Sequence, residues 1–226
     1  MVQKYSGAAT EPAAPAKRRG RPRAYDPDAA LTQAMETFWK SGYAGTSLDD
    51  LSAATGMNRP SLYAAFGDKQ EIYVKAYARY RARIREDFRP LLETQEPLRQ
   101  VLRKIFEASC ALYLSGADGP RGCFSVVTAA SEAVADPEIR KMVVEAIAAL
   151  DQTFASLFAK AIERGELAKG ADPAALAKIA TATLHTLAVR ARAGIAKREL
   201  DALIDASVAL TCGPESAKPR RKGAAG

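Results

Sequence analysis

The side chains best suited to chemistry in this sequence are hydrogen-bond donors that lie close together after residue 58. Arg59 carries a planar guanidinium, which matches the two acceptors on the edge of a guanine or the oxygens of a phosphate. The Ser61 hydroxyl and the Tyr63 phenol follow at two-residue steps, and the Lys69 ammonium comes six residues later. Donors of these types bind the base edges and the phosphate backbone of DNA. We therefore expect these four side chains to contact double-stranded DNA.

A second group of positive charges lies near the N-terminus, in the run KRRGRPR at residues 17–23. Gly20 allows close approach of the backbone, and Pro22 favours an extended chain. Arg19 and Arg21 then fit a narrow A·T-rich minor groove, and the run is similar to the AT-hook core Arg-Gly-Arg-Pro. We expect this arm to bind the minor groove, and the alternative is a tail that only improves solubility.

The net charge of +7 is concentrated at the two ends of the 226-residue chain. Residues 1–25 hold six basic residues and one acidic residue, and residues 211–226 hold four and one. The body between them is nearly neutral. Tails rich in Ala, Gly, Pro and basic residues bury too little apolar surface to fold alone, but they attract polyanions. For the C-terminal tail, solubility and contact with DNA are equally good explanations.

Several other kinds of chemistry are poorly supported by the composition. His185 is the single histidine, and Cys110, Cys123 and Cys212 have no CxxC spacing, so we expect no metal and no other cofactor. The sequence has no GxSxG motif and no phosphate-binding glycine loop, which argues against an enzyme. It also has no signal-like apolar block and no uncharged apolar stretch of about 18–20 residues. We expect a cytoplasmic protein with free thiols and no membrane partner.

The elements that must position these residues are predicted to be helices. After residue 25, apolar residues recur at helical spacing without sustained two-residue alternation. Three Asp-Pro pairs, which start at Asp26, Asp136 and Asp172, each combine an N-cap with a proline that the first helical turn tolerates. We predict an all-α chain of about nine helices. The first helix spans residues 27–41. The second is opened by a capping box at 46–49 and ends at 56. The others span residues 58–67, 68–90, 97–115, 122–134, 137–164, 173–193 and 197–211.

Residues 47–66 have the pattern of a helix-turn-helix motif. Two short helices meet at Gly56, and the longer helix at 27–41 supports them. Leu62 and Phe66, four residues apart, are expected to face the core, which leaves the first turn of the second short helix free to enter a groove. Thr46 or Ser47, at the start of the first short helix, is expected to meet a phosphate.

The stretch GYAGTSLDDLSAATGMNRPSLYAAFGDKQEIY resembles the N-terminal domain of TetR/AcrR-type transcriptional regulators. The matching features within residues 27–75 are Phe38, Gly42, Gly45-Thr46-Ser47, Leu51, Ala54, Gly56-Met57, Leu62-Tyr63, Phe66 and Lys69. The resemblance implies a homodimer, most often a repressor, that binds a pseudo-palindromic operator and releases it when a small-molecule effector binds. It implies DNA contacts at Thr46, Ser47, Asn58, Arg59, Ser61, Tyr63 and Lys69.

Two positions depart from the pattern of that family. Pro60 stands where glycine is frequent, which removes a backbone N–H from the contact with phosphate, and Ala65 stands where an aromatic residue or histidine is frequent. We therefore expect Arg19 and Arg21 to carry more of the affinity for DNA. The expected organisation is a basic arm at 1–25, a DNA-binding domain at 26–70, a helical domain for effector binding and dimerisation at 71–212, and a basic tail at 213–226.

The helical bundle after residue 70 is expected to supply an effector pocket and a dimer interface. The pocket candidates are aromatic residues with two polar groups, namely Phe106, Cys110, Tyr113, Phe124, Phe154, Phe158 and His185. The dimer candidates are apolar stripes on the last two helices, namely Leu184, Leu187, Ala191, Leu200, Leu203, Ile204, Ser207 and Val208. For both sets, packing inside one subunit is the alternative role.

Two other functions are compatible with the sequence. One is an architectural DNA-binding protein that is indifferent to sequence, in which the basic tails dominate binding. The other is a thiol-based redox regulator, although no basic residue is placed in sequence to activate Cys110, Cys123 or Cys212.

Overall fold

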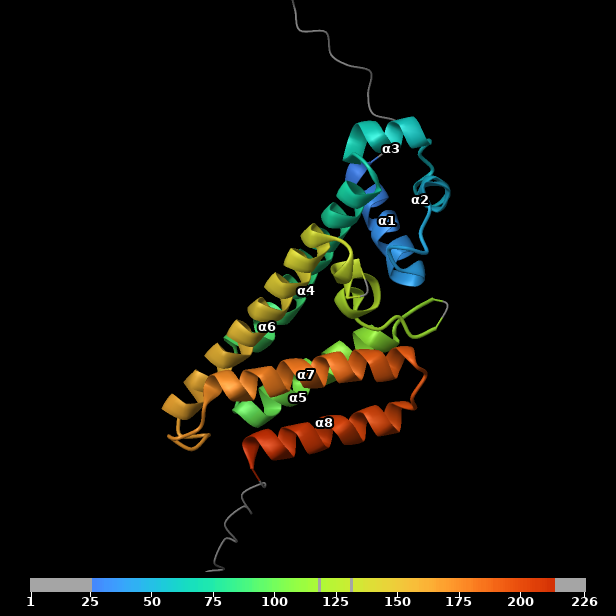
Figure 1. Ribbon diagram of the computed structural model, residues 1–226. Coiled ribbons are helices and arrows are strands. Elements are labelled where there is room, and N and C mark those ends of the chain that lie inside the picture. The colour runs from blue at the N-terminus through green and yellow to red at the C-terminus, as the bar shows by residue number, and fades with distance from the viewer. Residues whose placement is uncertain (1–25, 118, 131, 214–226) are drawn as a thin grey trace, which may run out of the picture.

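The computed structural model describes residues 26–117, 119–130 and 132–213, and within these ranges all regular secondary structure is helical (Figure 1). It contains eight α-helices, one π-helix and one short 3-10 helix in the described part of the chain. The prediction of an all-α fold with an N-terminal helix-turn-helix unit and a C-terminal bundle is confirmed. The arm with Arg19 and Arg21 and the C-terminal tail lie outside the described residues.

The first unit consists of α1 (Pro27–Ser41), α2 (Leu48–Thr55) and α3 (Arg59–Phe66). Each helix begins at a side-chain cap, which satisfies backbone N–H groups that have no partner inside the helix: Asp26 caps α1, Ser47 caps α2 and Asn58 caps α3. The predicted capping box was placed one residue too early. Ser47 is the cap, and the carboxylate of Asp50 accepts the backbone N–H of Ser47 in return.

The long helix α4 (Lys69–Glu93) connects the first unit to the rest of the molecule. The prediction that it ends near Pro90 is wrong, because the helix continues for three more residues. Proline removes one backbone donor and disfavours a helix interior. Here Leu91 and Leu92 pack against the core of the bundle, and this packing holds the last turn in place.

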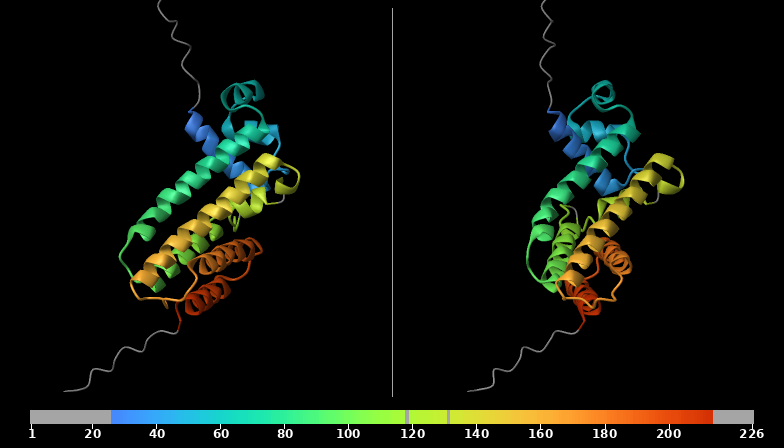
Figure 2. Two further views of the ribbon diagram at one scale, coloured as in Figure 1. Left: turned by 60° about the vertical axis from the view of Figure 1, so that its left-hand side comes forward. Right: turned by 90° about the vertical axis from the view of Figure 1, so that its left-hand side faces the viewer.

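The bundle is formed by α5 (Leu98–Leu114), α6 (Pro137–Glu163), α7 (Pro173–Arg192) and α8 (Lys197–Cys212). Figure 2 shows that α4 and α6 run alongside each other away from the helix-turn-helix unit. The two helices α7 and α8 pack on α5 at the end of the molecule opposite to α3 (Figure 1).

The segment between α5 and α6 differs from the single helix predicted at 122–134. It forms a π-helix, η1 (Ser125–Ala129), and a 3-10 turn, η2 (Glu132–Val134). Side chains from α4 contact this segment: the Tyr73 hydroxyl lies 2.7 Å from the Thr128 hydroxyl, and the Tyr77 hydroxyl donates to Ser125 at 2.9 Å. Helical spacing in the sequence does not reveal such long-range contacts. Single turns of π-helix are frequent at functional sites.

Two hydrophobic cores stabilise the fold. One lies inside the bundle, and the other joins the helix-turn-helix unit to α4, η1 and the start of α6. Phe124 is fully buried at the centre of the second core, where its ring lies 5.2–5.9 Å from the rings of four other aromatic residues: Trp39, Tyr73, Tyr77 and Tyr80. The packing of the first unit therefore extends past residue 70 along α4.

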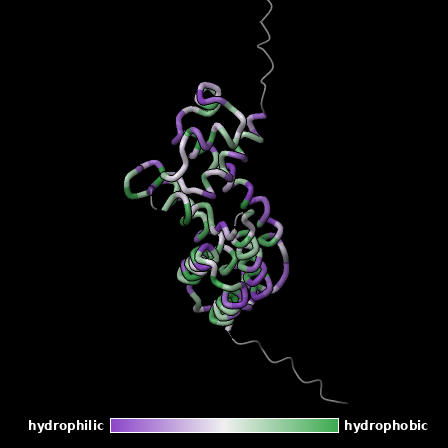
Figure 3. Tube along the Cα trace, turned by 90° about the vertical axis from the view of Figure 1, so that its right-hand side faces the viewer, coloured by the Kyte–Doolittle hydropathy of each residue, from purple (hydrophilic) through white to green (hydrophobic). Residues whose placement is uncertain are grey.

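The helix α6 is long and apolar enough, by length and composition alone, to span a membrane, and it is the one helix of this kind in the described ranges. The long helix of a helical bundle meets the same criteria. α6 carries Glu145 and Asp151 within its length and packs along α7. Figure 3 shows polar and apolar segments alternating along the bundle helices, as expected for helices that have one buried and one exposed face.

Candidate nucleic-acid interface

The helix α3 lies at one end of the molecule with its first turn exposed (Figure 1). Leu62 and Phe66 anchor it, because both side chains are buried on the inner face. The side-chain oxygen of Asn58 accepts the backbone N–H of Ser61 at 2.9 Å, which fixes the first turn. Tyr63 is 48% exposed on the outer face. The outer face of α3 is thus a short rigid surface of polar and small side chains, narrow enough for a DNA major groove.

Arg59 is held in place before any DNA is present. Its Nε and Nη2 atoms donate to the two carboxylate oxygens of Asp49 in α2, at 2.8 and 2.6 Å. The hydrogen bond from Arg59, and then its positive charge, lower the pKa of Asp49, so the pair is fully ionised at neutral pH. Both side chains are largely exposed to solvent. A guanine edge or a phosphate could take the place of the Asp49 carboxylate, because each presents two acceptors to the same two donors of Arg59.

Asp49 belongs to this surface but was not predicted from the sequence. It lies ten positions before Arg59, and no helical or strand spacing connects the two residues. The signal that was available is the turn at Gly56, which folds α2 back against α3. An acidic residue in the first turn of α2 then faces the arginine that opens α3.

Replacement of Asp49 by Asn should strengthen binding to all DNA sequences several-fold. The change removes one negative charge beside the phosphates and frees the guanidinium of Arg59 from its carboxylate partner. Fluorescence anisotropy with operator and with random duplex, at one fixed salt concentration, measures both affinities. Weaker binding of the operator alone would instead mean that Asp49 orients Arg59 in the complex. Asp87→Asn is the matched control, because Asp87 also pairs with an arginine but lies on α4, away from α3.

The other predicted DNA contacts differ in exposure and in their side-chain partners. Ser47 is exposed at the start of α2, and Lys69 lies with its ammonium 4.5 Å from the centre of the Tyr43 ring at the start of α4. Thr46 is only 1% exposed, and its hydroxyl donates to the backbone oxygen of Gly42 at 2.7 Å. The Thr46 side chain therefore stabilises the turn before α2 and does not lie on the exposed surface.

The helix-turn-helix unit is tied to the bundle by hydrogen bonds as well as by the second core. The indole N–H of Trp39 donates to the backbone oxygen of Gly122 at 3.2 Å, and the guanidinium of Arg121 lies 4.4 Å from the centre of the Trp39 ring. Arg121 also pairs with Glu36 of α1 at 3.2 Å. From α7, Arg192 donates to the backbone oxygen of Lys40 at 3.1 Å. These contacts join α1 directly to the segment after α5 and to α7.

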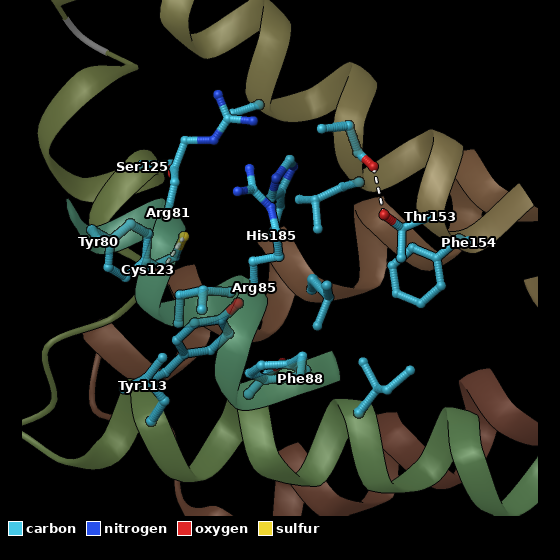
Figure 4. A pocket seen from close by; sticks show the side chains of 18 of the residues that line it. Tyr80, Arg81, Arg85, Phe88, Tyr113, Cys123, Ser125, Thr153, Phe154 and His185 are labelled. Atoms are coloured by element: carbon cyan, nitrogen blue, oxygen red, sulfur yellow. Dashed lines mark hydrogen bonds between the residues drawn. The ribbon is translucent and has the colours of Figure 1, made fainter. Parts of the chain in front are cut away.

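A cavity of about 190 Å³ lies within the bundle between α4, α5, α6 and α7 (Figure 4). Three of the predicted pocket residues line it: Tyr113, Phe154 and His185. Burial lowers the pKa of His185, and Asp151 opposes this effect, so the imidazole is neutral at pH 7. The other four predicted pocket residues do not line this cavity. Phe106, Cys110 and Phe158 pack inside the bundle core, and Phe124 belongs to the core shared with the first unit.

The predicted dimer stripes face inward in the structure. Six of the eight residues are buried inside the chain, namely Leu184, Leu187, Ala191, Leu200, Ile204 and Val208. The other two, Leu203 and Ser207, are half-buried. The six buried residues close the core of their own subunit. The outward faces carry small and apolar residues: Ala175, Ile179, Ala182, Thr186 and Val189 at steps of three and four on α7, and Ala202, Ala206, Ala209 and Leu210 on α8.

Comparison with known proteins agrees with this architecture over both parts of the chain. Residues 30–76 match the family described as bacterial regulatory proteins, tetR family, and residues 94–208 match the tetracyclin repressor-like C-terminal domain. The HTH-type transcriptional repressor ComR of Escherichia coli (strain K12) is 30% identical over 81% of this chain and 88% of its own length. The repressor BdcR of the same organism is 27% identical over 62% of this chain and 70% of its own length.

Solved structures give the same result. A cysteine mutant of the TetR family transcriptional regulator CifR, complexed with 26-base-pair operator DNA, is 32% identical. It superimposes with a TM-score of 0.75 and covers 83% of this chain and 98% of its own length. With the exposed α3, the supporting helices and these matches taken together, the chain belongs to the tetR family of bacterial DNA-binding transcriptional regulators.

Proposed function

We propose that the protein is a cytoplasmic repressor without enzymatic activity, which binds a pseudo-palindromic operator as a homodimer and leaves it when an effector binds. The observation that carries this function is the exposed first turn of α3, which Asn58 caps and Leu62 and Phe66 anchor. The proposed DNA contacts are Ser47, Asn58, Arg59, Ser61, Tyr63 and Lys69, with Arg19 and Arg21 in the arm.

A dimer is proposed because one helix of this length reads only a few base pairs. Helix-turn-helix proteins reach useful specificity with two half-sites about one helical turn apart, or a multiple of it. The outward faces of α7 and α8 support such a dimer. They lie side by side, they carry small side chains that allow close helix packing, and they expose Ile179, Val189 and Leu210.

Release by an effector is supported by the position of the cavity. The helix α4 lines the cavity with its middle part, and its first part is packed in the core of the helix-turn-helix unit. A ligand that binds best to one position of α4 shifts the protein toward the conformation with α4 in that position. If that conformation binds the operator less tightly, the ligand and the operator each reduce the affinity of the protein for the other by the same factor.

Selection of bound duplexes from a random pool, with the purified full-length chain at physiological salt, tests this function. We expect an inverted repeat, which would establish sequence readout and two-fold symmetry together. If the recovered duplexes shared no sequence, the protein would instead be an architectural DNA-binding protein.

A thiol-based switch has less support from the described residues. Burial raises the pKa of the Cys110 thiol and of the Cys212 thiol, which lowers the fraction of reactive thiolate at neutral pH. Redox-sensing cysteines have lowered pKa values and good access to solvent. A variant without cysteines that still released its operator in response to peroxide would exclude this function.

Replacement of Arg59 by Ala should weaken operator binding by roughly 5- to 100-fold and relax the preference for one base pair in each half-site. The guanidinium has the geometry to make two hydrogen bonds to a guanine, and alanine makes none. Repeating the selection with the variant measures both effects. An equal loss of affinity for all sequences would mean that Arg59 contacts a phosphate only.

Deletion of residues 1–24 should weaken operator binding and reduce its dependence on salt. Each phosphate contact contributes about 0.9 to the slope of log K against log salt concentration, and the arm holds six of the basic residues. Titrations between about 50 and 200 mM salt measure the slope. An unchanged affinity and slope would remove the arm from the interface.

A further inference from the structure

The walls of the cavity in the bundle are mostly apolar. Side chains from three helices form its deeper part, among them Ile84, Phe88, Leu92, Leu150, Phe154 and Leu184. An empty cavity of about 150 Å³ with such walls is large enough for benzene. At about 190 Å³, this cavity has room for one aromatic ring, or for an aliphatic chain of similar volume, with a short extension. The cavity therefore fits an apolar group of about this size.

Two arginines of α4 interrupt these apolar walls. Arg81 and Arg85 are four residues apart, so they lie on the same face of the helix, and both line the cavity. Figure 4 shows their side chains and His185 toward one part of the cavity, with Phe88 and Tyr113 toward another. The cavity thus has a cationic part and an apolar part.

The charges of these two arginines are not neutralised by carboxylates of the described residues. No ion pair joins either one to an acidic side chain, whereas Arg79 and Arg83 on the same helix pair with Asp28 and Asp87. No aspartate or glutamate is among the residues that line the cavity. The nearest acidic influence is Asp151, which acts on His185 from α6. Arg85 is exposed to solvent and Arg81 is half-buried, so both positive charges are available to an anionic ligand that enters the cavity.

We propose that the effector of this regulator is a small apolar monocarboxylate, whose carboxylate binds Arg81 and Arg85 and whose ring or chain fills the apolar part of the cavity. This inference rests on the proposed effector site. The neutral imidazole of His185 adds one hydrogen bond to the same carboxylate from α7. A carboxylate held between α4 and α7 restricts α4, which continues into the helix-turn-helix unit through Tyr77 and Tyr73.

Calorimetric titration of the full-length, DNA-free protein with octanoate and 3-phenylpropanoate tests the inference. Octanamide and 3-phenylpropanamide, which have the same apolar parts and no charge, are the matched ligands. We expect both acids to bind at least tenfold more tightly than their amides, because charge-assisted hydrogen bonds are about twice as strong as neutral ones. The Arg81→Gln/Arg85→Gln variant should lose at least tenfold in affinity for the acids and bind the amides unchanged.

The Arg83→Gln/Arg89→Gln variant is the matched control. It removes the same charge from the same helix at positions that do not line the cavity, so its affinity for the acids should equal that of the original protein. Amides that bind as tightly as acids, acids that do not bind, or equal losses in both double variants would each overturn the inference. These results concern the protein without DNA. Operator binding, measured separately, can therefore fail or succeed independently of them.

Discussion

Replacement of Phe124 by Ala is expected to lower the free energy of unfolding by about 3–5 kcal/mol. The side chain is fully buried, and its removal leaves a cavity that the surrounding rings cannot fill without moving. For a chain of this length, such a loss corresponds to a decrease in Tm of very roughly 6–20 °C.

The large effect follows from the position of Phe124 in the structure. Its ring stacks on Tyr80 at 5.2 Å and lies edge-on to Trp39 at 5.5 Å, and it also contacts Tyr73 and Tyr77. These neighbours come from α1 and α4, whereas Phe124 precedes η1. Alanine at this position therefore loosens the joint between the helix-turn-helix unit and the bundle, not the interior of one unit alone.

Thermal and urea unfolding at one fixed protein concentration measure this effect, because a dimer makes the apparent stability depend on concentration. Tyr63→Ala is the matched control: it also removes an aromatic ring, but from an exposed position, so its effect should stay within about 0.5 kcal/mol. A loss below about 1 kcal/mol for Phe124→Ala would contradict the role of Phe124 as the centre of the shared core.

The first unit was predictable from the sequence because its signals are local. Asp26-Pro27 and Asn58 cap helices within a few residues of themselves, and Leu62 and Phe66 reveal the inner face of α3 by their spacing alone. The π-helix η1 was not predictable, because its contacts are with hydroxyl groups of α4, some 50 residues away in sequence, and helical spacing carries no signal of them. The last turn of α4 beyond Pro90 likewise depends on distant packing.

The cavity was only partly predictable for the same reason. Tyr113, Phe154 and His185 were found as aromatic and polar residues on bundle helices, but aromatic residues are equally suited to a closed core, as Phe106 and Phe158 show. Arg81 and Arg85 were missed because charged residues on a long helix look like a solvated face. Only the position of α6 alongside α4 makes that face the wall of a cavity.

The outward faces of α7 and α8 were also hidden in the sequence. Hydrophobicity identifies the residues that pack in the core of the subunit, and in α7 these include Leu184 and Leu187. A surface that packs against a second copy needs small residues for close approach more than it needs large apolar ones. The alanines of this face are therefore weak signals until the structure shows that they point outward.

Replacement of both Ile179 and Val189 by Glu is expected to convert the proposed dimer to a monomer and to weaken operator binding by about 10²–10⁴-fold. The two residues are 61% and 54% exposed on α7, so the substitutions cost the isolated subunit little. In the dimer, they place four carboxylates in a small apolar interface, where unpaired charges are strongly unfavourable. The loss of affinity follows because the second recognition helix no longer benefits from the high local concentration that the first one provides.

Sedimentation equilibrium at micromolar concentration, together with anisotropy on operator and half-site duplexes, separates dimerisation from DNA contact. The variant should bind a half-site as well as the original protein does and lose affinity only for the full operator, because its α3 is untouched. Val144→Glu is the matched control, since Val144 is 60% exposed and belongs to α6, which is not part of the proposed dimer face. If the double variant remained a dimer, the outward face of α7 would not be the interface. If it were monomeric but retained full affinity, operator recognition would not require two linked subunits.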